Sequence, residues 1–157
     1  MNPWHDVNIG DDSPELVKGI IEISKHSRAK YKLCKKTGTL KLDKVLFNAS
    51  HYPANYGFIP KTFCDDKDPL DIFIISDISI VPMCVVRAKV IGVMRLLHGT
   101  EADDKIIAVA QNDDSVNHYN DVSELPDYMK NELKKFFDSY KSEEQRTYMV
   151  EEFQSKE

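Results

Sequence analysis

The sequence predicts a mainly β protein of the α+β class, built as a small closed or partly open β-barrel with helical cover. Short alternating or apolar segments recur along the chain, and the clearest helical pattern comes late, at about 126–141. No helices alternate with the strands, which argues against a parallel α/β sheet. The 157 residues, 41% of them apolar, suffice for one core, so we expect a single domain over 1–157.

The expected strands are short and bounded by turn residues. They span residues 17–24, 30–34, 40–47, 70–75, 83–97 and 105–109, with a hairpin turn at Thr37-Gly38 and a bulge or bend at Gly92. In the first strand Ile21 and Ile23 alternate with Glu22, so Glu22 is expected on the opposite face from both. The segment 51–60, with two prolines and a glycine, is expected to be an ordered loop, and the polar segment 111–124 a second one.

The helix at 126–141 has a start signal and one apolar face. Pro126 suits the first turn, and Asp127 interacts favourably with the helix dipole. The apolar face follows the i, i+3, i+4, i+7 spacing through Leu133, Phe136, Phe137 and Tyr140. The tail from Glu143 onward is expected to fray from the helix or to be mobile, and residues 1–16 to form an irregular arm.

Composition limits the partners and the compartment. The formal net charge of -5 disfavours nucleic acid as the main partner. Three widely spaced cysteines form neither a disulfide framework nor a cysteine zinc site, and they favour a reducing compartment. The first residues lack a signal-peptide pattern, and no apolar run approaches membrane-spanning length. These observations predict a soluble cytoplasmic protein with no nucleic-acid or membrane partner.

The densest group of acidic residues is Asp66, Asp68 and Asp71, directly before the apolar run 72–75. Carboxylates this close repel one another, and they ionise together only when a cation lies among them, usually a hard divalent ion with oxygen ligands. An EF-hand loop does not fit, because Asp71 stands where that loop needs glycine. A turn at Pro69 explains the same residues equally well.

Three further groups could complete a site for a phosphate compound. Glu101, Asp103 and Asp104 precede an expected strand, although a solvated hairpin tip explains this segment better by itself. The tyrosines of the segment 52–58 could donate to phosphate oxygens or pack in the core. Lysine ammonium groups neutralise phosphate, although each lysine singly is more typical of a solvated surface. These lysines are Lys30, Lys44, Lys105 and Lys141.

Taken together in order and spacing, these motifs resemble the soluble family I inorganic pyrophosphatases from about Trp4 to Lys141. The matching pieces are Ile21-Glu22-Ile23, Lys30-Tyr31, the segment 52–58, Asp66-x-Asp68-Pro69-Leu70-Asp71, Asp103-x-Lys105 and Phe136-Phe137-x-x-Tyr140-Lys141. The resemblance implies a five-stranded, OB-like closed β-barrel with flanking helices. It also implies hydrolysis of pyrophosphate to two phosphates by a metal-activated water.

The resemblance assigns a role to each candidate site residue. The ligands of Mg²⁺ would be Asp66, Asp71 and Asp103, with Glu22 reaching a further metal through water. The general base that helps to deprotonate the attacking water would be Asp68. The groups that hold the phosphates would be Lys30, Lys44, Tyr56, Lys105, Tyr140 and Lys141. The family also implies a homo-oligomer, with a hexamer favoured.

Four residues depart from the family's pattern: Lys32, Lys44, Lys67 and His98. Lys44 keeps the charge of the usual arginine but loses its bidentate fork. His98 stands where the family has an acidic ligand, and its nitrogen suits Mn²⁺, Co²⁺ or Zn²⁺ better than Mg²⁺. Lys32 replaces a glutamate and Lys67 lies between two aspartates, so we expect a less negative site and weaker loading of the later metals.

These departures leave an alternative open, in which the chain is a catalytically weak or inactive pyrophosphatase-like protein that binds phosphate or a partner protein. In addition, only residues 143–157 remain for the second helix with which the family often continues. That shortening puts the packing of an oligomer in question more than the chemistry.

Overall fold

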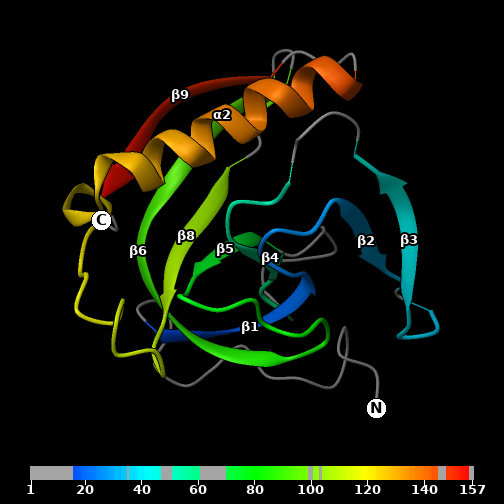
Figure 1. Ribbon diagram of the computed structural model, residues 1–157, viewed down its shortest axis with the longest axis horizontal. Coiled ribbons are helices and arrows are strands. Elements are labelled where there is room, and N and C mark those ends of the chain that lie inside the picture. Colours follow the sequence, from blue (N-terminus) through cyan, green and yellow to red (C-terminus); the bar gives the residue numbers. More distant parts are fainter. Residues whose placement is uncertain are drawn as a thin grey trace.

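The computed structural model describes residues 16–34, 36–46, 51–60, 70–98, 101–102, 104–144 and 148–155. Its centre is a closed barrel of five strands (Figure 1). The strands are β1 (Leu16–Ile23), β4 (Asn55–Phe58), β5 (Asp71–Ile75), β6 (Val85–His98) and β8 (Lys105–Ala110). They pair in the order β1-β4-β5-β8-β6, and β6 pairs again with β1, which closes the barrel. The expected five-stranded closed barrel is confirmed.

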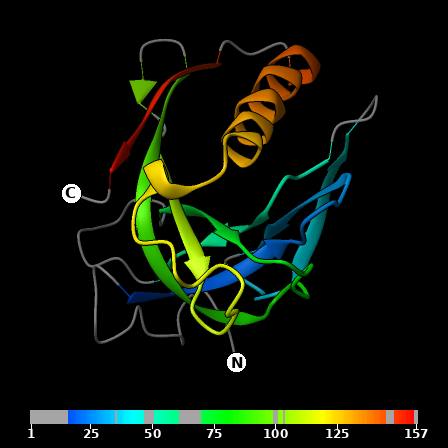
Figure 2. The same ribbon diagram turned by 60° about the vertical axis from the view of Figure 1, so that its left-hand side comes forward.

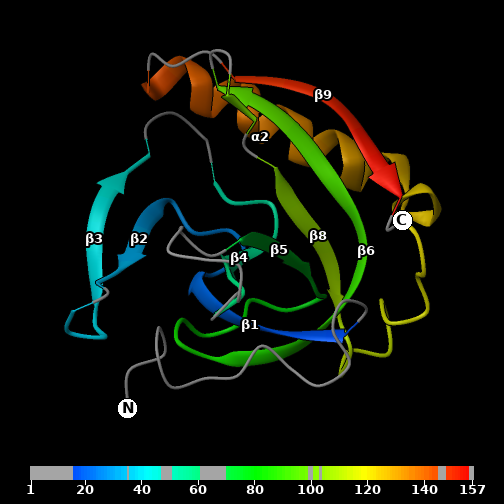
Figure 3. The same cartoon turned by 180° about the vertical axis from the view of Figure 1, so that it is seen from behind.

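The other elements surround this barrel. A separate antiparallel hairpin consists of β2 (Ala29–Leu33) and β3 (Leu40–Val45), and β7 (Glu101–Ala102) and β9 (Tyr148–Ser155) both pair with the far half of β6. The short helix η1 (Val122–Glu124) leads into α2 (Asp127–Glu144). Figure 1 and Figure 3 show α2 lying across one end of the barrel beside β9. Figure 2 shows the β2–β3 hairpin on the opposite side of the barrel from β6.

The core explains why β5 is almost continuously apolar. Ile72 and Ile74 pack in one buried cluster, whereas Phe73 and Ile75 pack in another. Alternate residues of a strand point to opposite faces, so both faces of β5 are covered. Two residues of the predicted helix face, Leu133 and Phe136, are buried in the same cluster as Phe73 and hold α2 against the barrel.

Most of the expected elements are confirmed within a few residues of their predicted ends. Gly38 turns the β2–β3 hairpin with a φ of 73°, and the pairing of β6 with β8 is irregular between Val90 and Gly92. The expected N-terminal arm lies outside the described residues except for Leu16, which begins β1. Within the described ranges, neither helix combines the length and the apolar character that a membrane crossing needs.

The prediction of a loop at 51–60 was wrong for residues 55–58, which form β4. The prolines of this segment lie outside the strand, where they remove no donor from the ladder. Gly57 permits the pairing, because a Cβ at that position would lie 1.8 Å from the carbonyl oxygen of Ile20 in β1. The prolines and the glycine of this segment are typical of a loop, and for this reason the sequence did not indicate the strand β4.

The prediction for the tail was also wrong. Residues 148–155, expected to fray or to be mobile, form β9 and pair with β6 from Gly92 to His98. This half of β6 extends past the residues that pair with β1, so one of its edges is open to another strand. The residues of β6 that pair with β9 lie 50 to 63 positions upstream, from His98–Tyr148 to Gly92–Ser155, so no local pattern of the tail indicates this pairing.

A bulge breaks the expected alternation in β1. Ile21 and Ile23 lie opposite Gly57 and Tyr56, which are consecutive residues, so Glu22 is the extra residue. Ile21 and Ile23 consequently pack in different buried clusters instead of on one face. The bulge therefore sets the direction in which the Glu22 side chain leaves the strand.

Candidate active site

A buried lysine and an aspartate meet where β5 and β8 begin. These two strands are parallel, with Asp71 opposite Lys105 in register, so their first residues lie at the same end of the barrel. The Lys105 Nζ donates to Asp71 Oδ2 at 2.6 Å. Lys105 is only 6% exposed, and a lysine is rarely buried to this degree unless a counter-ion accompanies it. The pairing of β5 with β8 therefore joins two motifs that are 34 residues apart.

Tyr56, on β4, adjoins this ion pair. Its ring centroid lies 5.8 Å from Lys105 Nζ, and the ring packs against Phe73 and Tyr52 with centroids 4.8 and 5.7 Å away. Burial, reinforced by the charge of Asp71, raises the pKa of the Tyr56 hydroxyl well above its ordinary value. The hydroxyl therefore keeps its proton and remains a hydrogen-bond donor.

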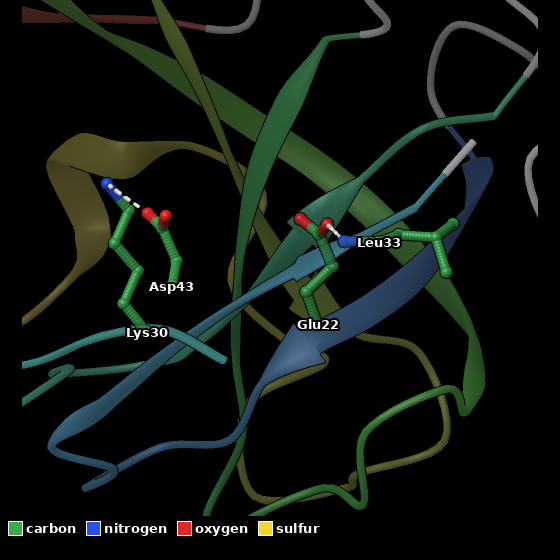
Figure 4. A network of polar contacts seen from close by, with 4 residues as sticks. All are labelled: Glu22, Lys30, Leu33 and Asp43. Carbon is green, nitrogen blue, oxygen red and sulfur yellow. Dashed lines mark hydrogen bonds and ion pairs between the residues drawn. The ribbon is translucent and has the colours of Figure 1, made fainter. Parts of the chain in front are cut away.

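Glu22, in the bulge of β1, supplies a second carboxylate. Its Oε2 accepts a hydrogen bond of 2.8 Å from the backbone N–H of Leu33, as Figure 4 shows. Burial raises the pKa of Glu22 to about 7; the Leu33 hydrogen bond opposes this rise, the charge of Asp71 adds to it, and Lys32 and Lys30 oppose it. Glu22 therefore lies within electrostatic reach of both Asp71 and the hairpin lysines.

The β2–β3 hairpin brings cations to the same region. Lys30 forms an ion pair with Asp43 at 3.6 Å (Figure 4) and lies directly opposite Lys44 in the hairpin register. The Leu33 amide that donates to Glu22 belongs to the same hairpin. This hydrogen bond joins the hairpin to β1 at Glu22, the carboxylate on which the charges of Lys30 and Lys32 act.

The structure brings together five described members of the predicted site, which are Glu22, Lys30, Tyr56, Asp71 and Lys105. A sixth, Lys44, lies opposite Lys30 in the hairpin register. Asp66, Lys67, Asp68 and Asp103 lie outside the described residues. Tyr140 and Lys141 lie in the C-terminal part of α2, and His98 ends β6 opposite Glu101 of β7; for these three only the backbone is described.

Asn55 is a residue that the sequence motifs did not single out. It is fully buried; its Oδ1 accepts from the backbone N–H groups of Lys25 and Ile80, and its Nδ2 donates to the carbonyls of Ile74 and Ile78. These bonds join β4 to the turn after β1, to β5 and to the loop after β5, and Asn55 is the residue next to Tyr56. An amide among apolar and aromatic neighbours was the available signal, because a buried polar side chain requires partners.

Two described carboxylates, those of Glu22 and Asp71, are of the ligand type that a hard divalent cation prefers. Within the described residues no group of three or more His, Cys, Asp or Glu side chains could hold a metal ion. Two of the four predicted ligands, Glu22 and Asp71, are described, and their charges interact. Both supply carboxylate oxygens, which Mg²⁺ prefers as ligands.

Comparison with known proteins supports the family that the motifs indicated. The sequence model of the inorganic pyrophosphatase family matches residues 19–157. The chain is 45% identical over 152 residues to soluble inorganic pyrophosphatase 4 of Arabidopsis thaliana, an alignment that covers 97% of this chain and 70% of the relative. It is 43% identical to a soluble inorganic pyrophosphatase of Solanum tuberosum, with 97% and 72% covered.

Solved structures agree with the sequence comparison. The inorganic pyrophosphatase of Thermus thermophilus superposes with a TM-score of 0.90 at 33% identity, covering 98% of this chain and 90% of that chain. That of Helicobacter pylori superposes with a TM-score of 0.88 at 35% identity, covering 97% and 91%. The five-stranded barrel is the fold of this class of enzyme, and the chain belongs to the inorganic pyrophosphatase family.

Proposed function

We propose that this chain hydrolyses inorganic pyrophosphate to two phosphate ions. The observation that carries the proposal is its 45% identity, over 97% of its length, to a soluble inorganic pyrophosphatase. This likeness favours a working enzyme over a catalytically weak or inactive protein that only binds phosphate or a partner.

The charges of the described residues suit a substrate with several negative charges. Lys105 is held at the start of β8 by Asp71, and Lys30 and Lys44 lie opposite each other on the hairpin. Ammonium groups at these positions would neutralise phosphate oxygens, and Lys105 would stabilise the leaving phosphate as negative charge gathers on it. Tyr56 would donate its retained proton in a hydrogen bond to a phosphate oxygen. We assign the same binding role to Tyr140 and Lys141.

We assign metal binding to four carboxylates, those of Glu22, Asp66, Asp71 and Asp103. A bound divalent cation would shield the charge of pyrophosphate and make the attacking water more acidic. Asp68 would accept the proton from that water as general base. Mg²⁺ is the expected metal, while His98 would favour Mn²⁺, Co²⁺ or Zn²⁺ if it stands among the ligands.

The proposal extends to the setting of the enzyme. We infer a single domain over 1–157, a cytoplasmic location and a homo-oligomer, with a hexamer favoured. The cysteine usage and the family membership support these inferences.

Phosphate release from pyrophosphate tests the proposed function. The purified chain is freed of metal and then titrated separately with Mg²⁺, Mn²⁺, Co²⁺ and Zn²⁺, with Asp68→Asn as the matched control. We expect turnover that requires metal and that falls by at least about a hundredfold in Asp68→Asn. Release no greater than that of Asp68→Asn with every metal would leave only the binding function. The metal that gives the highest turnover would show whether His98 changes the preference.

A further inference from the structure

The β2–β3 hairpin carries two pairs of lysines that face each other across its strands. Lys30 lies opposite Lys44, and Lys32 lies opposite Lys41. Directly opposed residues of an antiparallel pair share a face, and like charges in this arrangement destabilise the pair. In the inner pair, the ion pair of Lys30 with Asp43 offsets part of this repulsion, whereas neither outer lysine forms an ion pair with a described side chain. The outer pair in particular favours a functional reason for its lysines, and the binding of an anion fits their chemistry.

A bulge at Asp43 puts all four lysines on one face. Asp43 has no residue opposite it in β2, and Lys41 and Lys44 lie on either side of it in the sequence. In a regular strand these two lysines, three positions apart, would point to opposite faces. The extra residue returns Lys44 to the face of Lys41. The other face carries Tyr31, which packs against the core.

This lysine face adjoins the candidate active site. The charges of Lys30 and Lys32 both act on the Glu22 carboxylate, which Leu33 of the same strand also contacts (Figure 4). Glu22 in turn interacts with Asp71. Lys30 and Lys32 of the hairpin therefore lie within electrostatic reach of the barrel carboxylates, and Lys44 and Lys41 lie opposite them.

Neither lysine of the outer pair is a binding or catalytic group in the proposed hydrolysis of pyrophosphate. Lys32 and Lys41 are exposed, and neither forms a salt bridge with another described side chain. Alternate residues of a strand are about 6.6 Å apart, so the outer pair lies within reach of an anion already held by the inner pair. A longer phosphate chain than pyrophosphate could contact both pairs.

We propose that Lys32 and Lys41 form a subsite for the third phosphate group of a linear triphosphate. The subsite rests on the proposed function, because the other two phosphates would occupy the pyrophosphate site. Water would add to one of the two phosphorus atoms in the pyrophosphate site, and the proton of that water would pass to Asp68. The bond from this phosphorus to the bridging oxygen would break, and the electron pair would stay on that oxygen. The products of tripolyphosphate would be phosphate and pyrophosphate.

The test compares tripolyphosphate with pyrophosphate as substrates of the same full-length variants. In Lys41→Ala we expect the ratio of the KM for tripolyphosphate to the KM for pyrophosphate to rise about fivefold, and further in the Lys32→Ala/Lys41→Ala double variant. Lys41→Arg, which keeps the positive charge, should restore the ratio. Lys135→Ala, which removes an exposed lysine of α2, is the matched control for a change in net charge.

Calorimetric binding of the two anions to the metal-free variants separates this proposal from the proposed function. If the wild-type chain hydrolyses neither anion, the proposed function fails. The subsite is still supported if the ratio of the Kd for tripolyphosphate to the Kd for pyrophosphate rises in Lys41→Ala. A ratio unchanged in the double variant, or changed equally in Lys135→Ala, overturns the subsite. The same binding measurement is repeated with ATP. If Lys41→Ala weakens the binding of ATP as well, the subsite also accepts nucleoside triphosphates. If it weakens the binding of tripolyphosphate alone, the subsite is restricted to inorganic chains.

Discussion

Gly57 shows at the scale of a single residue how closely the barrel strands approach. A Cβ at this position would lie 1.8 Å from the Ile20 carbonyl oxygen and 3.0 Å from the Ile21 Cα, both of them backbone atoms of β1. Backbone atoms within a paired strand cannot move aside without breaking the ladder. The residue next to Gly57 is Tyr56, so the same close pairing also positions a predicted phosphate-binding group.

We expect Gly57→Ala to lower the free energy of unfolding by about 3 kcal/mol, because β4 must separate from β1 to admit the methyl group. The measurement is urea unfolding followed by circular dichroism. Gly19→Ala is the matched control, since its Cβ would meet only the flexible end of Ile74 at 2.8 Å. Because its other neighbour, the Ile72 Cγ2, lies at an ordinary contact distance of 3.5 Å, this substitution should cost about 1 kcal/mol. Equal losses in the two variants would contradict this account of Gly57.

At the scale of the elements, one aspartate joins two loops at an end of the barrel. Asp113 follows β8; its Oδ2 accepts from Ser76 Oγ and from the Asp77 N–H, which follow β5, both at 2.7 Å. Its Oδ1 accepts from the hydroxyl and the N–H of Ser115, at 2.6 and 3.0 Å. These bonds, above all the one from the Ser115 hydroxyl, hold the pKa of the Asp113 carboxyl well below its ordinary value.

The lowered pKa of Asp113 predicts how stability depends on pH. The carboxylate form is bonded in the folded state, so its contribution is complete above the unfolded pKa of about 4 and is lost as pH falls toward the folded value. Because solvent screens this partly exposed carboxylate, we expect Asp113→Asn to cost only about 1 kcal/mol at pH 7 and progressively less below pH ~4. The measurement is the urea midpoint of both proteins between pH 7 and pH ~2, with Asp114→Asn as the control in the same loop. A difference that kept its full size at the lowest pH would refute the assignment.

At the scale of the whole molecule, β6 links the barrel to the elements beyond it. Its first half pairs with β1 over residues 85–89, and its second half pairs with β9 over 92–98, along the same edge. Its other edge pairs with β8 and then with β7. Closure of the barrel therefore depends on the first half of β6, and β9 protects the second.

A chain ending at Glu144 tests this division. Without β9, we expect the backbone amides of 95–98 to exchange with solvent much faster, because their remaining partner is the two-residue β7. Residues 86–90 should keep their protection, since β1 and β8 still pair with them. Hydrogen exchange read by mass spectrometry, with the full chain as reference, distinguishes the two halves. Loss of protection at 86–90 would mean that barrel closure itself requires β9.

Separate motifs could be recognised in the sequence, whereas several connections of the fold could not. Asp71, Lys105 and Tyr56 were chosen from separate motifs, and the structure places them in contact at one end of the barrel. The strand β4 and the tail strand β9 were missed, because prolines in one segment and charged residues in the other obscured the alternation. Asn55 was also missed, since its four hydrogen bonds go to backbone groups 19 to 30 residues away.

By itself, the sequence determined most of the barrel strands, with β4 as the exception, and it also determined where the long helix lies and to which family the chain belongs. Local periodicity and the order of the motifs contain that information, because each segment must bury its own apolar face. Only the tertiary structure decided which strands pair, that β1 bulges at Glu22 and that the parallel register sets Asp71 against Lys105. Strand pairing is a contact between residues far apart in the chain, so its register depends on partners that no single segment encodes.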